Sequence, residues 1–244
     1  MSSEFLQPDL SKGLMKREKI SNYNGWIYEE IKPYLGNKIL DIGSGVGSII
    51  NYFIKDAEIL VGTDIFEKQV QLMQERFKNY NNVSIDLFIL NNSETDKYKK
   101  LGLNTITCIN VLEHIEDDRL ALETMKDILV KNGRIILLVP AYRNLYGTLD
   151  KACGHFRRYD KGDLQKLADS LDLRIIENKH MNFMGIIPWY IKGKVLKKKM
   201  TFSESLNGSN KNIYNFAAPL LMAVEKKIRP HIGISEIIVL EKIK

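Results

Sequence analysis

The sequence is poor in cysteine and in long apolar runs, and each shortage excludes a class of protein. Two cysteines among 244 residues, Cys108 and Cys153, cannot form a disulfide framework and lack CxxC spacing, so we expect a reducing compartment. No stretch free of charged residues exceeds thirteen, at 42–54 and 212–224, whereas a membrane-spanning helix needs about 20. Residues 1–10 have no basic segment followed by an apolar one, so we expect no secretory signal and a cytoplasmic protein.

Acidic residues are scarce in one late part of the chain. The formal charge is +6, but residues 181–230 hold nine basic and two acidic residues, so this segment carries +7 and the rest −1. Because the excess is local, we expect no nucleic-acid partner. Within the segment, apolar and aromatic residues at 187–191 precede five lysines at 192–199. This pattern suits a lid with solvated lysines, and it also suits contact of residues 181–199 with an anionic membrane.

Strand and helix patterns alternate along most of the chain. Apolar runs predict strands at 38–42, 58–63, 83–90, 105–111, 134–139, 173–180 and 234–242. Helical spacing predicts helices at 12–35, 48–55, 67–79, 117–130 and 161–170. This alternation predicts an α/β fold with a parallel sheet and helices on both faces.

One domain, 1–244, accommodates all of these elements. We expect an N-terminal helical segment at 1–37, an α/β core at 38–180, a helical cap at 181–232 and a final strand at 233–244. The cap is an insertion and not a separate domain, because a strand of the sheet follows it.

A glycine-rich turn follows the first predicted strand. It contains Asp41, Gly43, Gly45 and Gly47 and leads into a helix. Glycines allow a sharp turn and close ligand approach, and the free amides of the helix face the ligand. A dinucleotide site needs G-x-G-x-x-G, but Ser48 stands at the third glycine position. The carboxylate also opposes a pyrophosphate and suits a cationic ligand.

A second acid, Asp64, ends the next predicted strand. An acid at this point of an α/β sheet can accept hydrogen bonds from ribose hydroxyls. Its alternative role is to cap the following helix, with Glu67 completing a capping box.

The two acids and the G-x-G-x-G turn resemble the first motifs of class I S-adenosylmethionine-dependent methyltransferases. Later blocks at 109–115, 139–141, 154–159 and 233–239 are similar to the small-molecule and quinone-type branch of that family. The resemblance implies a Rossmann-like seven-strand sheet with an N-terminal helix and a helical cap before the last strand. It also implies S-adenosylmethionine as cofactor, S-adenosylhomocysteine as product and a small-molecule acceptor, which can be lipid-linked or anionic. The implied cofactor contacts are Asp41, Gly43, Gly45, Gly47, Asp64, Ile65, Asn110 and Val111.

One family feature is missing near the end of the third strand. Ile89 stands where the family has an acid that contacts adenine, and Asn91 and Asn92 follow it. This departure leaves a catalytically degenerate nucleotide-binding or scaffold protein as the second interpretation. A nicotinamide-dependent oxidoreductase is third, because Ser48 and Asp41 disfavour a dinucleotide.

Two histidines are candidate general bases. His114 follows the fourth strand and His155 the fifth, at the edge where open α/β sheets bind ligands, and imidazole titrates near neutral pH. The alternative for Glu113 and His114 is a turn that caps the helix at 117–130. We expect no metal site.

Four residues are candidates for acceptor contact: Tyr23, Arg157, Arg158 and Tyr159. Adjacent arginines can grip an anionic group by bidentate hydrogen bonds. Alternatively, the arginines pair with neighbouring acids, and Tyr159 belongs to the segment that starts the helix at 161–170. Tyr23 can close over the site from the N-terminal helix or belong to its apolar face.

Overall fold

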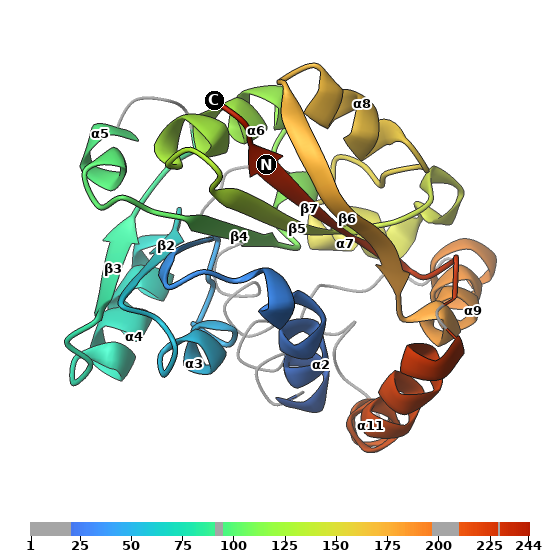
Figure 1. Ribbon diagram of the computed structural model, residues 1–244. Helices are drawn as coiled ribbons and strands as arrows, with labels where there is room; N and C mark the ends of the chain where they lie inside the picture. The colour runs from blue at the N-terminus through green and yellow to red at the C-terminus, as the bar shows by residue number, and fades with distance from the viewer. Residues whose placement is uncertain (1–20, 91–94, 197–209, 229) are drawn as a thin grey trace.

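A seven-stranded sheet forms the centre of the molecule in the computed structural model, which describes residues 21–90, 95–196, 210–228 and 230–244 (Figure 1). The strand order is β3-β2-β1-β4-β5-β7-β6. Every predicted strand is confirmed within a few residues. The strands are β1 Lys38–Ile42, β2 Ile59–Asp64, β3 Val83–Leu87, β4 Thr105–Ile109, β5 Arg134–Pro140, β6 Leu173–Met181 and β7 Ser235–Lys242.

The direction of β7 differs from the expected parallel sheet. It pairs antiparallel with both neighbours, with Val239 opposite Ile136 of β5 and Leu240 opposite Ile175 of β6. The reason lies in the connection. Met181 at the end of β6 is the register partner of Ser235 at the start of β7. The chain therefore enters β7 at the same end of the strands at which it left β6. A strand that starts there must run in the opposite direction.

Helices cover both faces of the sheet. They are α2 Ser21–Ile31, α3 Ile50–Phe53, α4 Glu67–Phe77, α5 Thr95–Lys99, α6 Asp118–Ile128, α7 Thr148–Cys153, α8 Asp163–Asp169, α9 Ile186–Tyr190 and α11 Asn210–Ile228. Short 3-10 turns include η1 Lys32–Tyr34, η2 Leu112–His114, η3 Arg143–Leu145 and η4 Phe183–Gly185, and Ile191–Val195 forms a π-helix. Helix α6 begins after Asp117, whose carboxylate accepts a hydrogen bond from the Leu120 amide at 2.9 Å. The part of the predicted 12–35 helix before residue 21 lies outside the described residues.

Two apolar cores result from the alternation of side chains along each strand. Leu40 of β1 packs with residues of α5, α6 and α8, whereas the adjacent Ile39 packs with residues of α2, α3 and α4. Figure 1 shows these two sets of helices on opposite faces of the sheet. β1, β4 and β5 are buried on both faces, which explains their almost continuous apolar runs.

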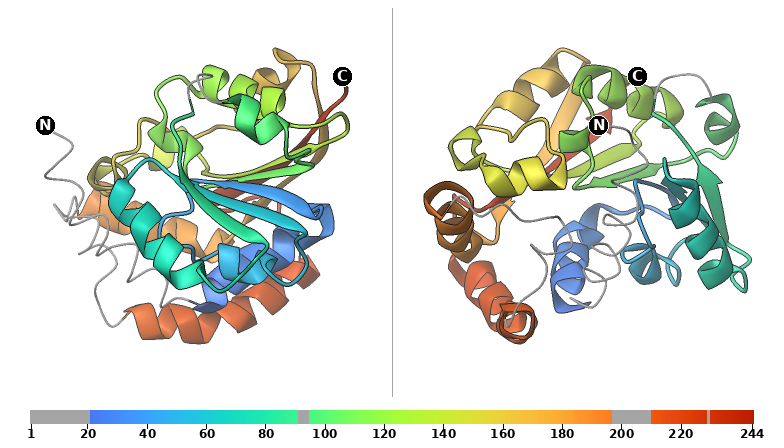
Figure 2. Two further views of the ribbon diagram at one scale, coloured as in Figure 1. Left: turned by 90° about the vertical axis from the view of Figure 1, so that its left-hand side faces the viewer. Right: turned by 180° about the vertical axis from the view of Figure 1, so that it is seen from behind.

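The helical insertion between β6 and β7 is present as expected. Its helix α11 packs against α2, and Figure 2 shows the two side by side. The carboxylate of Glu225 on α11 accepts hydrogen bonds from the amides of Asn182 and Phe183 at 2.8 and 2.7 Å, which ties α11 to the end of β6. None of the helices in the described ranges has the length and apolar character to cross a membrane.

Candidate cofactor and active site

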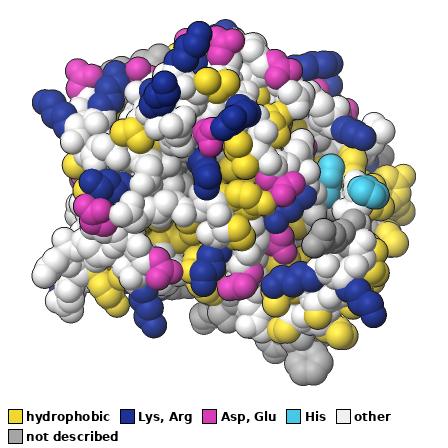
Figure 3. Space-filling view, viewed as in Figure 1, with side chains coloured by type: hydrophobic (Ala, Val, Ile, Leu, Met, Phe, Trp, Pro, Cys, Tyr) yellow, Lys and Arg dark blue, Asp and Glu magenta, His cyan; other side chains and the backbone are white. Residues whose placement is uncertain are grey.

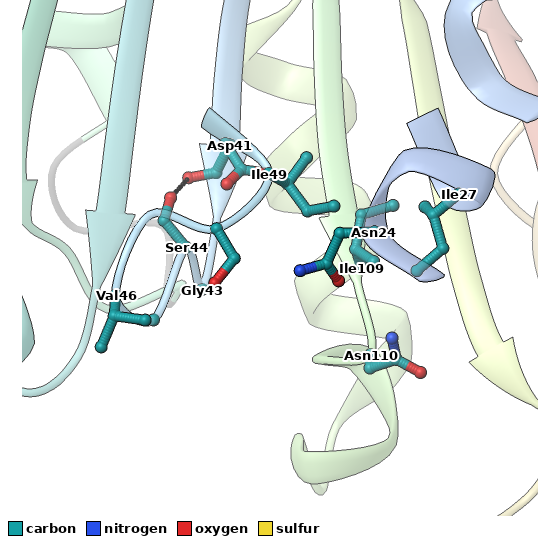
Figure 4. Close-up of a pocket in the computed structure, with 11 residues that line it drawn as sticks. Asn24, Ile27, Asp41, Gly43, Ser44, Val46, Ile49, Ile109 and Asn110 are labelled. Carbon is teal, nitrogen blue, oxygen red and sulfur yellow. Dashed lines mark hydrogen bonds between the residues drawn. The ribbon is translucent and has the colours of Figure 1, made fainter. Parts of the chain in front are cut away.

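A pocket opens at the carboxyl ends of β1 and β4, where the order of strands reverses (Figure 4). Chain connections lead from β1 to β2 on one side, while β4 and β5 lie on the other, which leaves a crevice between the loops. Figure 4 shows Asn24 of α2 between the glycine turn and Asn110 at the end of β4. The lining residues are Asn24, Ile27, Asp41, Gly43, Ser44, Gly45, Val46, Ser48, Ile49, Ile109 and Asn110.

The glycine turn has a backbone that favours glycine at three positions. Gly43, Gly45 and Gly47 have φ values of +67°, +62° and +78°. A Cβ on Gly43 would lie 2.4 Å from Val111 Cγ2, and one on Gly47 would lie 2.4 Å from Phe77 Cε2. Gly43 and Gly47 are therefore needed for packing within the protein, and Gly43 and Gly45 also line the pocket.

Asp41 places a carboxyl group inside the pocket wall. It is 3% exposed, and its Oδ1 accepts a hydrogen bond of 2.6 Å from the Thr107 hydroxyl. Burial raises its pKa to about 6, although hydrogen bonds from Thr107 and Ser44 oppose this shift. A cationic ligand would favour the ionised carboxylate, so the site suits positive charge.

Asp64 joins the glycine turn to the end of β2. Its Oδ2 accepts from the Gly45 amide at 2.9 Å and its Oδ1 from the Phe66 amide at 3.0 Å. Burial raises its pKa to about 6. The capping alternative is wrong, because α4 has Phe66 as its N-cap residue. The ribose contact of Asp64 stays a prediction, as does the cofactor contact of the adjacent Ile65, which is exposed.

Two asparagines complete the pocket. Asn110 has φ +54°, and its buried side-chain nitrogen has no hydrogen-bond partner among the described residues. A buried donor without a partner is costly, so this atom fits a ligand that carries an acceptor. Sequence reasoning missed Asn24, because an amide on an amphipathic helix has no distinguishing pattern. Ile89, at the missing acid's position, is exposed, and Asn91 and Asn92 lie outside the described residues.

These features fit S-adenosylmethionine, whose sulfonium and ammonium groups are cationic. Asp41 offers the negative charge, the turn offers close backbone approach, and Asn110 offers an unused donor. The proposed holders of the cofactor are thus the glycine turn, Asp41 and Asn110, with Asp64 and Val111 supporting the turn.

The structure brings His114 and His155 together next to η2. Their ring centroids are 4.8 Å apart at 82°, and His155 Nε2 lies 3.9 Å from the buried Glu113 carboxylate. One ligand atom each of Glu113, His114 and His155 lies within 4.8 Å of the others, a spacing compatible with a metal ion, so the expected absence of a metal stays a prediction. The capping alternative for residues 113 and 114 is wrong, because Asp117 is the cap of α6.

The predicted acceptor residues after β5 bind to other parts of the protein. Arg157 forms an ion pair with Asp118 at 2.8 Å, and Tyr159 donates to the same carboxylate at 3.0 Å. Arg158 is 2% exposed, with Nε 2.6 Å from Asp150 Oδ1 and NH1 2.9 Å from the Ala141 carbonyl oxygen. These contacts favour the ion-pairing alternative, most strongly for the buried Arg158.

Tyr23 lies on α2, one residue from the pocket-lining Asn24. Its ring packs edge-on against the buried Trp26, with centroids 6.2 Å apart, and the side chain is half-buried. The structure therefore places Tyr23 partly on the apolar face of α2, and its acceptor contact stays a prediction.

The sheet order with antiparallel β7 and a pocket at the β1/β4 switch point defines the class I methyltransferase fold. A model of the methyltransferase domain family matches residues 40–135. Over these residues the chain matches the methyltransferase domain family, and its sheet has the strand order of the class I S-adenosylmethionine-dependent methyltransferases.

Known methyltransferases are similar to this chain in sequence or in fold. The ubiquinone biosynthesis O-methyltransferase of Pasteurella multocida is 26% identical over 120 residues, which are 45% of this chain and 49% of that protein, so the chain spans just under half of that relative. A structure described as a putative sarcosine dimethylglycine methyltransferase from Galdieria sulphuraria has a TM-score of 0.62 at 14% identity, covering 91% of this chain and 85% of that one. The N-methyltransferase NodS from Bradyrhizobium japonicum, solved in complex with S-adenosyl-L-homocysteine, has a TM-score of 0.55 at 12% identity, covering 90% and 85%.

Proposed function

We propose that this protein transfers a methyl group from S-adenosylmethionine to a small-molecule acceptor that binds beside η2 and residues 154–156. The observation that carries the proposal is the pocket at the strand-order reversal, where buried Asp41 faces a ligand space with the unpartnered Asn110 nitrogen. When bound, the cofactor supplies an electrophilic methyl group on a sulfonium.

The protein's contribution is chiefly to position the acceptor. Methyl transfer is an in-line displacement, so holding the acceptor atom opposite the sulfur supplies much of the rate. His114 and His155 stand near the end of β4, whose Asn110 lines the pocket, and either one is a candidate to remove a proton from the acceptor.

Calorimetry and turnover test the proposal together. We expect S-adenosylmethionine and S-adenosylhomocysteine to bind, and NAD to bind far more weakly. Turnover is measured with labelled methyl donor and a panel of acceptors that includes catechol, 3,4-dihydroxybenzoate, aniline and sarcosine, alongside lipid-linked compounds. Tight NAD binding without S-adenosylmethionine binding contradicts the proposal. Binding without turnover of any acceptor supports the degenerate alternative.

A lipid-linked acceptor is the finer form of the proposal, and the surface of the cap supports it. The cap surface consists of exposed apolar side chains on α9 and the π-helix beside two lysines: Ile187, Tyr190, Ile191, Val195, Lys192 and Lys194. Figure 3 shows hydrophobic side chains at the edge of the molecule where α9 lies, while charges of both signs are interspersed over the rest of that face. Apolar side chains next to cations suit an anionic lipid surface. The lysines at 197–199 lie outside the described residues.

Sedimentation with vesicles tests this contact. We expect binding to phosphatidylserine-containing vesicles, weaker binding as salt rises, and none to pure phosphatidylcholine. Ile187→Ser with Val195→Ser should release the protein, whereas Ile176→Ser, an exposed apolar residue on β6, should not. No sedimentation at low salt leaves the cap as a solvated lid.

A further inference from the structure

The carboxylate of Asp150, on the short helix α7, is completely buried and collects four donors. His155 Nδ1 and Arg158 Nε lie 3.1 and 2.6 Å from Oδ1. The Gly147 amide and the Trp189 indole donate to Oδ2 at 2.9 and 3.3 Å. Burial alone would raise the pKa of Asp150, but the His155 hydrogen bond and the Arg158 charge outweigh it and lower that pKa. The carboxylate is therefore ionised at neutral pH.

This contact fixes which nitrogen of His155 carries the proton. An ionised carboxylate can only accept hydrogen bonds, so the nitrogen that faces it must be Nδ1–H. In neutral imidazole the lone pair is then on Nε2, which lies on the side of η2 and Glu113. The backbone amide of Phe156 also donates to the Glu113 carbonyl at 2.8 Å, so His155 is held against the segment that follows the pocket-lining Asn110.

His114 is more exposed than His155. Its Nδ1 lies 3.3 Å from the Gly154 carbonyl oxygen, and its side chain is exposed. The His155 side chain is only 11% exposed, and its partner is Asp150 of α7. Asp150 is bound in turn to Arg158 and to Trp189 of the cap. A proton acceptor that is held in one orientation is the better placed base.

We propose that Asp150 positions His155 as the general base for a hydroxyl acceptor, an inference that rests on the proposed methyltransferase function. In this step the acceptor oxygen forms a bond to the methyl carbon and the carbon–sulfur bond breaks, with its electron pair left on sulfur as a neutral thioether. The hydroxyl proton passes to His155 Nε2, and the imidazolium later releases it to water. A neutral amine does not need this proton transfer before attack, so the arrangement favours a hydroxyl compound as acceptor.

The tautomer of His155 is measured directly in the unmodified protein. The chain has four histidines, and labelling their side chains with nitrogen-15 lets long-range NMR correlations report which ring nitrogen is protonated. His155→Gln assigns the signal. We expect His155 as the Nδ1–H tautomer, with and without S-adenosylhomocysteine. An Nε2–H tautomer overturns the proposal, and so does a shift of the His155 Nε2 signal on addition of an equimolar amount of Zn²⁺ that EDTA reverses, because that nitrogen would then be a metal ligand.

Kinetics separate positioning from structural support. With catechol or 3,4-dihydroxybenzoate as acceptor, Asp150→Asn and His155→Gln should each lower kcat about 10²–10⁴-fold, and the double variant should be no worse than the more impaired single one. The S-adenosylhomocysteine dissociation constant should stay within about twofold. Trp189→Phe is the matched comparison, because it removes a donor from the other oxygen of the same carboxylate. It should lower kcat much less than Asp150→Asn and leave the His155 tautomer unchanged.

Three results overturn the inference. The first is an equal loss of kcat in Trp189→Phe and Asp150→Asn, which indicates structural support alone. The second is full additivity of the Asp150 and His155 variants. The third is methylation of aniline or sarcosine but of neither hydroxyl compound. Failure of S-adenosylhomocysteine to bind would instead refute the proposed function, while the tautomer measurement would still stand.

Discussion

Buried carboxyl groups at single positions determine how this protein responds to pH. Asp41 and Asp64 each have a pKa raised to about 6 by burial, and Glu236 on β7 has one raised to about 7 for the same reason. The first two adjoin the pocket, whereas Glu236 lies between Val139 and His180 in the sheet. We therefore expect the first pair to affect ligand affinity and Glu236 to affect the stability of the fold.

The affinity for S-adenosylmethionine should fall as the pH falls through 6. Ionised Asp41 suits the cationic groups of the ligand, and ionised Asp64 is the stronger acceptor for ribose hydroxyls and for the Gly45 amide. At pH 5 only about one in ten carboxyls with a pKa of 6 is ionised, so affinity should weaken roughly tenfold per group required. Calorimetry at pH 5 and pH 7.5 measures this. Asp41→Asn should bind weakly at both values and show a smaller pH dependence. Equal dissociation constants at the two pH values would contradict the role of both acids.

Glu236→Gln should stabilise the protein above neutral pH. The folded-state pKa is raised, so between about 4.5 and 7 the unfolded state releases the proton while the folded state retains it, and stability falls as pH rises through this window. Glutamine cannot ionise, so the variant should unfold at a higher temperature at pH 8, by up to about 3 kcal/mol in free energy of unfolding, and match the native protein near pH 4.5. Thermal melts at the two pH values provide the measurement. A constant difference between the proteins would show that the effect is not ionisation.

The length and burial of an element decide whether the sequence predicts it. The long buried strands were predicted, whereas the short helix α7, which carries Asp150, was not. The mostly apolar runs of β1, β4 and β5 predicted these strands, because each strand is buried on both faces. Helix α7 was not predicted, because six residues are too few to show helical periodicity. Its Asp150 was missed for a related reason, since an acid in a polar loop resembles a solvated one. Arg158 was assigned to the acceptor because a sequence does not reveal whether an arginine faces inward.

Two substitutions in the glycine turn can be compared because they cause a similar backbone strain. Gly45→Ala and Gly47→Ala both place a side chain at positive φ, which costs roughly 1–2 kcal/mol. At Gly47 the new Cβ would also lie 2.4 Å from Phe77 Cε2 in the core. We therefore expect Gly47→Ala to lower the melting temperature more, and Gly45→Ala to weaken S-adenosylmethionine binding more. Thermal melts and calorimetry on both variants check this, and the reverse order would mean that Gly45 does not face the ligand.

At the scale of the whole molecule, ligand binding and folding are linked. The pocket is lined by residues from two separate stretches of the chain, 24–49 and 109–110, which meet only in the folded protein. The sequence motifs predicted most of this arrangement, because the loops at the carboxyl ends of neighbouring strands must meet. They did not reveal the direction of β7, since residue patterns describe burial and not the path of the chain through the cap.

S-adenosylmethionine should therefore raise the unfolding temperature. At a concentration 100 times the dissociation constant, a ligand that binds only the folded state adds about 2.7 kcal/mol to the free energy of unfolding. Melts with S-adenosylmethionine, with NAD and with neither should show a rise only for the first, and the rise should be much smaller in Asp41→Asn. An equal rise with NAD would point to a general nucleotide site.

Because Met181 and Ser235 are register partners, the segment between them could be replaced by another. Both ends of the 53-residue insertion between these positions meet on adjacent strands, so a cassette of another length could join them without altering the register of the sheet. Variation in this segment would leave the pairing of the strands unchanged, but its helix α11 packs against α2, whose Asn24 and Ile27 line the pocket. For protein engineering, a replacement segment must therefore reproduce the contact with α2 if the shape of the pocket is to be kept.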